Sequence, residues 1–171
     1  MIGKWDHFGW AKAPAVPPAD DFTFRLGAQF LDGLPVEDWG CGVGYFSTLH
    51  DGFYRGVDGS ATPAVHAIHD LTTYTSSGHN IFMRHVLEHN WSWERVLFNA
   101  LHSFHRRMVL VLFTPWADEV QAITVSDGIP DLSLVREEVV RHLAPFWWAS
   151  RENLVTDTQY KIEHVFFVER P

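Results

Sequence analysis

The folds open to this chain are limited most by an aspartate followed by three glycines at alternate positions, in Asp38-Trp39-Gly40-Cys41-Gly42-Val43-Gly44. A second short run, residues 54–57, ends in Asp58. About 20 residues separate the two aspartates, which is the length of one turn, one helix and one returning strand of a nucleotide-binding α/β unit. Glycines let the backbone approach a ligand closely, and a helix N-terminus beyond them offers positive potential. The stretch therefore predicts a nucleotide site.

The spacing Asp-x-Gly-x-Gly-x-Gly resembles the first motif of the class I, small-molecule type of S-adenosylmethionine-dependent methyltransferases. In that family the first acid lies near the methionyl ammonium of the cofactor, the glycine loop runs along the methionyl part, and the second acid binds the ribose. The resemblance thus implies a set of cofactor contacts in this region. They are Asp38, Gly40, Gly42, Gly44, Tyr45, Asp58 and Gly59.

A third acidic position follows a short candidate strand, residues 65–68, in the sequence His69-Asp70-Leu71. In the family that the chain resembles, an acid here accepts a hydrogen bond from the adenine amino group, and the next backbone amide meets the ring. A carboxylate is a suitable acceptor for that amino group. The resemblance implies these roles for Asp70 and Leu71, while the alternative is that Asp70 caps a turn.

The stretch from Phe82 to His89, Phe-Met-Arg-His-Val-Leu-Glu-His, resembles the fourth-strand motif of the same family. The resemblance places the end of this strand, with Arg84, beside the cofactor sulfonium and the acceptor. If the nucleophile keeps its proton, a histidine suits the role of base at neutral pH. His85 and His89 are the candidates, with His7 as a weaker one, and the alternative for both is packing or capping.

The same letters also fit the inverted zinc-peptidase motif, His85-x-x-Glu88-His89. That motif needs one helix through both histidines, with Glu88 as the general base. Residues 81–83 are typical of a strand instead, and Ser92 favours a new helix after the motif. We therefore expect no metal site.

The remaining pattern predicts a mostly parallel, seven-stranded Rossmann-like α/β sheet with an antiparallel C-terminal strand. Residues 1–19, rich in proline, are expected to form an arm, and residues 20–171 a single domain. Only six residues separate Asp58 from Val65, whereas a parallel crossover normally needs a dozen or more, so the sheet is expected to be shortened around its third strand. The expected strands are 36–39, 53–57, 65–68, 80–85, 108–113, 153–160 and 162–169.

Helices are expected before the first strand, with Phe22, Leu26 and Phe30 on the buried side, and over residues 44–50. Two more are expected after Ser92 and from Leu132 to Leu143. Residues 116–130 form a loop with a doubtful strand or turn.

The composition argues against several partners. A net charge of -8 disfavours binding to a nucleic-acid backbone. No apolar run approaches the roughly 18 residues of a membrane helix, and no apolar core follows Lys4 as in a signal peptide. The single cysteine, Cys41, fits a reducing cytosol. We expect a cytoplasmic protein that binds neither nucleic acid nor membranes, and exposed tryptophans are compatible with a homodimer.

The function that these patterns favour is methyl transfer from S-adenosylmethionine to the oxygen or nitrogen of a small-molecule acceptor, with S-adenosylhomocysteine as product. The acceptor itself stays open. The chain has eight tryptophans, which are expected either to pack in the core and on the surface or to help form an aromatic acceptor pocket. Such a pocket would be lined by Tyr45, Trp91 and the loop after residue 113. Two other functions remain: a non-catalytic binding or scaffold protein with the cofactor fold, and a nicotinamide-dependent oxidoreductase, which Asp58 fits but the glycine spacing does not.

Overall fold

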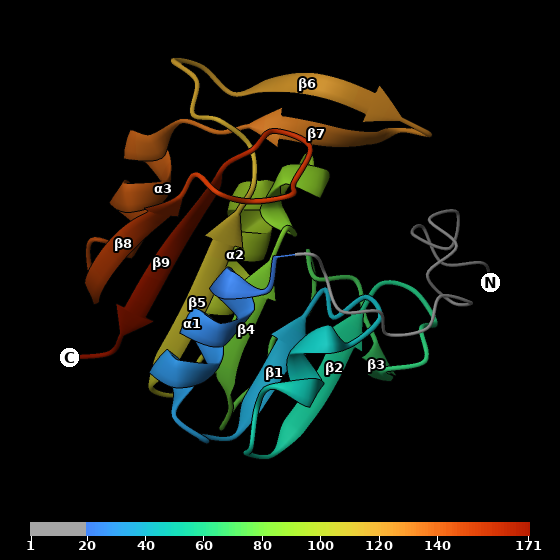
Figure 1. The fold of residues 1–171 in the computed structure, drawn as a ribbon, viewed down its shortest axis with the longest axis vertical. Coiled ribbons are helices and arrows are strands. Elements are labelled where there is room, and N and C mark those ends of the chain that lie inside the picture. The colour runs from blue at the N-terminus through green and yellow to red at the C-terminus, as the bar shows by residue number, and fades with distance from the viewer. Residues whose placement is uncertain (1–19) are drawn as a thin grey trace.

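The structure, a computed structural model, describes residues 20–171 (Figure 1). The predicted arm, with His7, Trp5 and Trp10, lies outside the described residues. The helices are α1 (Phe22–Leu31), α2 (Trp93–Ser103) and α3 (Arg136–Leu143), with single 3-10 turns η3 (Tyr45–Thr48) and η4 (Leu87–His89). The strands are β1 (Val36–Trp39), β2 (Tyr54–Asp58), β3 (Val65–Ile68), β4 (Asn80–Arg84), β5 (Arg107–Leu112), β6 (Gln121–Ser126), β7 (Ile129–Ser133), β8 (Trp147–Asn153) and β9 (Glu163–Glu169).

Seven strands form one sheet in the order β3-β2-β1-β4-β5-β9-β8. The first five pair in parallel, and β9 runs antiparallel to both β5 and β8. The expected Rossmann-like α/β class, with an antiparallel C-terminal strand, is confirmed. Among the described residues no helix is long and apolar enough to cross a bilayer.

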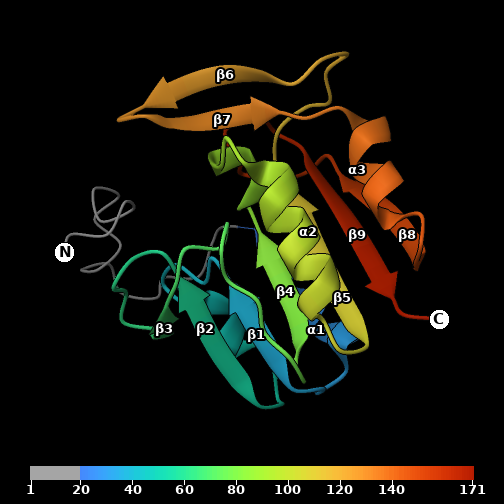
Figure 2. The same cartoon turned by 180° about the vertical axis from the view of Figure 1, so that it is seen from behind.

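The core lies on both faces of the sheet. Met108, Leu110 and Leu112 of β5 pack with α2 and α3, whereas Val109 and Val111 pack on the side of α1. Figures 1 and 2 show α1 on one face and α2 on the other. The continuous apolar run of β5 is therefore buried on both sides, as a central parallel strand requires.

Helix α1 differs from its expected orientation. Its fully buried positions are Thr23, Gly27 and Leu31, one residue further along than the predicted line. A Cβ on Gly27 would lie 2.5 Å from the ring of Phe82, so the glycine lets the helix backbone approach the sheet closely. Phe22, Leu26 and Phe30 are only half-buried beside this contact.

The helix expected over residues 44–50 is instead the single turn η3. Phe46 supplies its packing, because the rings of Phe46 and Phe82 stack at 3.9 Å. No helix connects β2 to β3 or β3 to β4. The sheet is thus shortened around β3 as expected, and Ile68 on this edge strand is 56% exposed.

The C-terminal third contains two further differences. The first strand of the closing pair is residues 147–153 rather than 153–160, and residues 154–162 connect it to β9. Residues 121–133 form a hairpin, because Asp127 and Gly128 take φ angles of 50° and 80°, which suit a tight two-residue turn. Leu132 therefore belongs to β7, and α3 begins only at Arg136.

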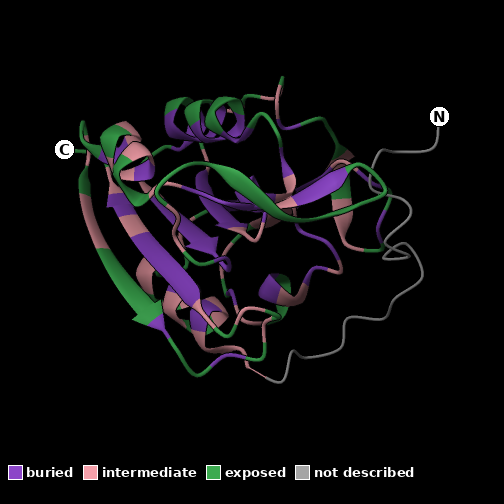
Figure 3. Ribbon diagram, turned by 90° about the horizontal axis from the view of Figure 1, so that it is seen from above, coloured by how far each residue is buried: buried purple, intermediate pink, exposed green. Residues whose placement is uncertain are grey.

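The β6–β7 hairpin passes over the edge of the sheet where the parallel strands end (Figures 1 and 3). Every residue of β6 is exposed, whereas four of the five residues of β7 are buried. The hairpin thus forms a cover above the carboxyl ends of β4 and β5.

Candidate functional site

A cavity of about 320 Å³ lies at the carboxyl ends of β1, β2 and β4. Strand β1 has β2 on one side and β4 on the other, so the chain order reverses here. Ligands of open α/β sheets bind at such a switch point. The lining residues are Phe24, Asp38, Gly40, Cys41, Gly42, Val43, Tyr45, Asp58, Gly59, His69, Asp70, Leu71, Phe82, Arg84, His85, Val86, His89 and Asn90.

The cavity lining contains both candidate histidines and all but one of the residues predicted to contact a cofactor. The exception is Gly44, whose φ angle is 77° and whose position would bring a Cβ within 2.1 Å of the Cβ of Ala64. Gly44 therefore shapes the turn into η3. Residues from five separate segments of the sequence meet at this one place, and their individual roles remain predictions.

The glycine loop needs its glycines for conformation. Gly40 and Gly42 have φ angles of 75° and 51°, in the left-handed region that side chains disfavour. A Cβ on Gly40 would also lie 2.3 Å from Cγ2 of Val86. Any other residue at position 40 would push the loop away from the turn after β4.

The two aspartates are both buried and face the loop. Asp58 accepts hydrogen bonds of 2.9 Å from the backbone N–H groups of Gly42 and Ser60, which ties the glycine loop to the end of β2. Asp38 accepts a hydrogen bond of 2.9 Å from the hydroxyl of Tyr54. Burial raises the pKa of Asp38 to about 7 despite that bond. An approaching cation would favour its ionised form.

Asp70 caps a turn, which is the alternative that the sequence left open beside a contact with adenine. Its Oδ1 accepts hydrogen bonds from the N–H of Thr72 at 2.9 Å and from the hydroxyl of Thr72 at 2.7 Å. The carbonyl of Leu71 is held by the side chain of Asn99 at 2.9 Å. The same turn nevertheless places His69, Asp70 and Leu71 on the cavity wall.

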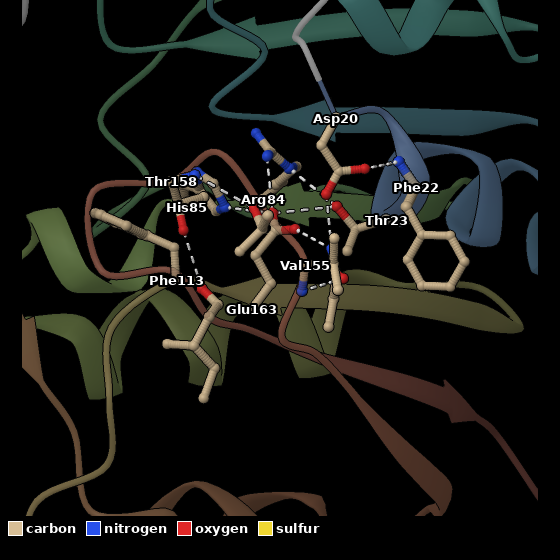
Figure 4. A network of polar contacts seen from close by, with 12 residues as sticks. Asp20, Phe22, Thr23, Arg84, His85, Phe113, Val155, Thr158 and Glu163 are labelled. Atoms are coloured by element: carbon tan, nitrogen blue, oxygen red, sulfur yellow. Dashed lines mark hydrogen bonds and ion pairs between the residues drawn. The ribbon is translucent and has the colours of Figure 1, made fainter.

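A polar network beside β4 is centred on Glu163 of β9 (Figure 4). Its Oε1 accepts hydrogen bonds from Nη2 of Arg84 at 2.7 Å, Nε2 of His85 at 2.9 Å and the hydroxyl of Thr23 at 3.2 Å. Asn153 donates to Oε2 at 3.1 Å. Arg84 also lies over the ring of Phe24, 4.3 Å from its centroid. Sequence reasoning missed Glu163, whose one signal was a carboxylate within an apolar strand.

The pKa values within this network move in opposite directions. Burial, together with the charge of Arg84, lowers the pKa of His85 to about 3. Burial alone would raise the pKa of Glu163, but the bond from His85 and the charge of Arg84 lower it to about 2. At neutral pH, Glu163 is ionised and His85 is a neutral ring that donates its Nε2–H to Glu163.

His89 is held by the hairpin. Its Nδ1 lies 3.1 Å from the carbonyl oxygen of Pro130 and 3.1 Å from Oδ1 of Asp131. Both neighbours are hydrogen-bond acceptors, so the proton of the neutral ring belongs on Nδ1 and the basic lone pair on Nε2. Asp131 also accepts bonds from the hydroxyls of Tyr160 at 2.8 Å and Thr124 at 3.1 Å.

The geometry of the zinc-peptidase motif is absent from residues 85–89. His85 has a φ angle of 57° and precedes the short turn η4, so no helix runs through both histidines. Glu88 is completely buried and accepts a hydrogen bond from the backbone N–H of Phe113. It is therefore turned into the core, away from any position where it could activate a water molecule.

Comparison with solved structures supports one fold. Magnesium protoporphyrin IX methyltransferase from Synechocystis PCC 6803, with S-adenosylhomocysteine bound, aligns with a TM-score of 0.62 and 16% identity over 98% of this chain and 96% of its own. The 1,6-didemethyltoxoflavin-N1-methyltransferase of Burkholderia thailandensis, with 1,6-didemethyltoxoflavin and S-adenosylhomocysteine bound, has a TM-score of 0.67 and 14% identity, and the alignment covers 89% and 80%. The mitomycin 7-O-methyltransferase MmcR has a TM-score of 0.58 and 14% identity, with 86% and 52% covered.

The chain has the fold of the class I S-adenosylmethionine-dependent methyltransferases. No protein-family model and no curated protein matches its sequence. At these identities the likeness establishes the methyltransferase fold, and the activity has to be argued from the residues of the site.

The aromatic residues of this methyltransferase fold mostly pack rather than line the site. Trp93 is buried in the core, and Trp116 and Trp148 pack against it. Trp91 is 57% exposed, and its indole N–H donates to the carbonyl of Gly128 at 3.2 Å. Of the aromatic residues expected at the site, Tyr45 lines the cavity.

Proposed function

We propose that this protein transfers the methyl group of S-adenosylmethionine to an oxygen or nitrogen of a small-molecule acceptor. The observation that carries the proposal is the shared cavity. Two buried aspartates, a glycine loop with positive φ angles and two histidines meet at the switch point of the sheet. The solved proteins that share the fold include an N1- and a 7-O-methyltransferase, which supports either kind of nucleophile.

The residues of the cavity fit the cofactor in three places. Asp38 supplies a carboxylate for the methionyl ammonium, and this is supported by its burial, because a neighbouring cation would favour the ionised form of a carboxyl group whose pKa is raised. Asp58, at the end of β2, is placed to accept ribose hydroxyls while it holds the loop. The turn at Asp70 and Leu71 borders the part of the cavity that would take the adenine.

Bound S-adenosylmethionine supplies a methyl group that its sulfonium already activates. The protein then has to hold the acceptor atom in line with the methyl carbon and sulfur, which alone lowers the barrier by several kcal/mol. Arg84 is the last residue of β4 and His85 follows it, and Glu163 accepts a hydrogen bond from both side chains. In the transfer the carbon–sulfur bond breaks as the new carbon–oxygen or carbon–nitrogen bond forms.

Where the nucleophile carries a proton, His89 is better suited as the base than His85. The pKa of His85 is lowered to about 3, so its ring is a poor proton acceptor at neutral pH. His89 faces the carboxylate of Asp131 with Nδ1, and that charge would stabilise the imidazolium formed when Nε2 takes up the proton. We therefore assign His89 as the base, and we assign to His85 the role of lining the cavity while it is hydrogen-bonded to Glu163.

The proposal is tested by incubating the protein with radiolabelled S-adenosylmethionine and fractionated metabolites. Transfer of label to a small molecule, abolished in the variant Asp58→Ala, is the expected result. Tight binding of S-adenosylhomocysteine with no transfer to any fraction would favour the non-catalytic binding protein instead.

A further inference from the structure

A second cavity, of about 380 Å³, lies beneath the β6–β7 hairpin. His85 and His89 line both this cavity and the first one, so the two cavities meet at the histidine pair. The remaining lining residues are Phe113, Thr124, Ser126, Ile129, Asp131, Thr158 and Gln159. We call this second cavity the hairpin cavity, and an acceptor bound in it would border the cofactor cavity at the two histidines.

The described residues that line the hairpin cavity are mostly polar, and few of them can carry a positive charge. Hydroxyls of Thr124, Ser126 and Thr158 and the amide of Gln159 surround it, and Phe113 and Ile129 form its apolar part. No lysine or arginine is among the described residues that line it. The nearest guanidinium in the network, that of Arg84, is already paired with Glu163 at 2.7 Å.

Among the described residues that line this cavity the one carboxylate is that of Asp131, and it already has hydrogen-bond donors. Oδ2 of Asp131 accepts the hydroxyls of Thr124 and Tyr160, and Oδ1 faces His89. A second anion brought beside Asp131 would meet its negative charge with no lysine or arginine among the described lining residues to offset it, which costs free energy in a partly closed site. A cation is not required either, because three donors already surround Asp131.

We propose that the hairpin cavity is the acceptor site and that it selects an uncharged molecule with hydroxyl groups over one that carries a carboxylate or phosphate. The inference rests on the proposed function. Thr124 donates to Asp131, so its oxygen can still accept a hydrogen bond from an acceptor hydroxyl, and Ser126 and Gln159 can both donate and accept. Alternation along β6 places Thr124 and Ser126 on the cavity side and Val125, 55% exposed, on the other.

The charge selection is tested with two matched probes, 4-hydroxybenzyl alcohol and 4-hydroxybenzoate, which differ in an alcohol and a carboxylate. Binding of each is measured by ligand-observed NMR with S-adenosylhomocysteine present at saturation. The wild type should bind the alcohol about tenfold more tightly than the carboxylate, equivalent to ~1.4 kcal/mol. The exposed residue Gln159 can be changed without loss of core packing, and Gln159→Lys should narrow or reverse the ratio.

Whether the probes bind in the hairpin cavity is tested by filling that cavity with a larger side chain. Ser126→Phe should abolish probe binding, whereas Val125→Phe, on the opposite side of the same strand, should leave it unchanged. Equal or tighter binding of the carboxylate, an unchanged ratio in Gln159→Lys, binding that survives Ser126→Phe, or no binding of either probe would each overturn the inference.

Calorimetry of S-adenosylhomocysteine on the same samples separates this inference from the proposed function. If the nucleoside binds and the probe results fail, only the assignment of the hairpin cavity falls. If the nucleoside does not bind to the wild type, the proposed function itself fails. Ser126→Phe should leave nucleoside binding intact, because Ser126 does not line the first cavity.

Discussion

The guanidinium of Arg84 donates a hydrogen bond of 2.7 Å to the carboxylate of Glu163, which joins the end of β4 to the start of β9. The two residues are 79 positions apart in the sequence. The side chain of Glu163 is 1% exposed and that of Arg84 is 15% exposed. The pair therefore holds the last antiparallel strand against the site, and it orients His85 through the same oxygen.

Glu163→Gln is expected to lower the free energy of unfolding at pH 7 by about 3 kcal/mol, because it leaves the charge of Arg84 buried without its partner. Glu169→Gln is the matched control. Glu169 lies on the same strand and pairs with Arg106 and Arg107, but these ion pairs are more exposed and should contribute less than about 1 kcal/mol. Urea denaturation measures both, and equal losses would contradict the assignment of a buried pair.

Gly40→Ala is expected to destabilise the protein and to impair cofactor binding. The positive φ angle costs about 1–2 kcal/mol for a residue with a Cβ, and the clash with Val86 adds to it. Gly128→Ala isolates the first contribution, since its φ angle is 80° and nothing lies within 4 Å of the added Cβ. Thermal unfolding of the two variants should show a clearly larger loss for Gly40→Ala, and identical losses would refute the role of Val86.

Affinity for S-adenosylmethionine should depend on pH through Asp38. Its pKa in the folded protein is raised to about 7, so below that value Asp38 must release a proton before it can pair with the ammonium. Binding should strengthen roughly five- to tenfold between pH 6 and 7.5, and weaken again once the ammonium itself, with a pKa of about 8, loses its proton. Calorimetry should find the acid-side dependence absent from Asp38→Asn, and its persistence there would assign it to another group.

The two histidines should respond differently to substitution. With a hydroxyl acceptor, His89→Gln is expected to lower kcat by about 100-fold or more, since it removes the base. His85→Gln replaces the imidazole, which is hydrogen-bonded to Glu163, by an amide of similar size, so kcat should fall much less. The fall in kcat decides between catalysis and packing when both variants unfold at the same temperature as the wild type and still bind S-adenosylhomocysteine. The opposite pattern would make His85 the base.

Much of the site could be predicted from the sequence because its signals are local. The glycines at alternate positions reflect alternate positive φ angles, and Asp58 ends the strand that follows the glycine loop. The apolar run of β5 indicated a strand buried on both faces, and the structure confirms it. The short connection after Asp58 indicated the reduced sheet around β3.

The missed features depend on contacts between distant residues. Nothing near Glu163 shows that it meets Arg84 and His85, which are about 80 positions earlier in the chain. The hairpin was missed for another reason. Asp127-Gly128 is a strong turn signal, and apolar residues alternate with polar ones over residues 123–126. Every residue of β6 is nevertheless exposed, so the strand adds no buried positions to the core pattern from which the other strands were predicted. The helix expected after the glycine loop is only a single turn, in which Phe46 packs on Phe82, a residue of a distant strand.

Binding of S-adenosylhomocysteine is the measurement that most directly tests whether a cofactor site lies at the switch point of the sheet. Titration calorimetry of S-adenosylhomocysteine should show micromolar affinity for the wild type. Asp58→Ala should weaken it about tenfold or more, whereas the exposed Asp51→Ala should leave it unchanged. Absence of binding to the wild type, or equal binding to a folded Asp58→Ala variant, would contradict the account.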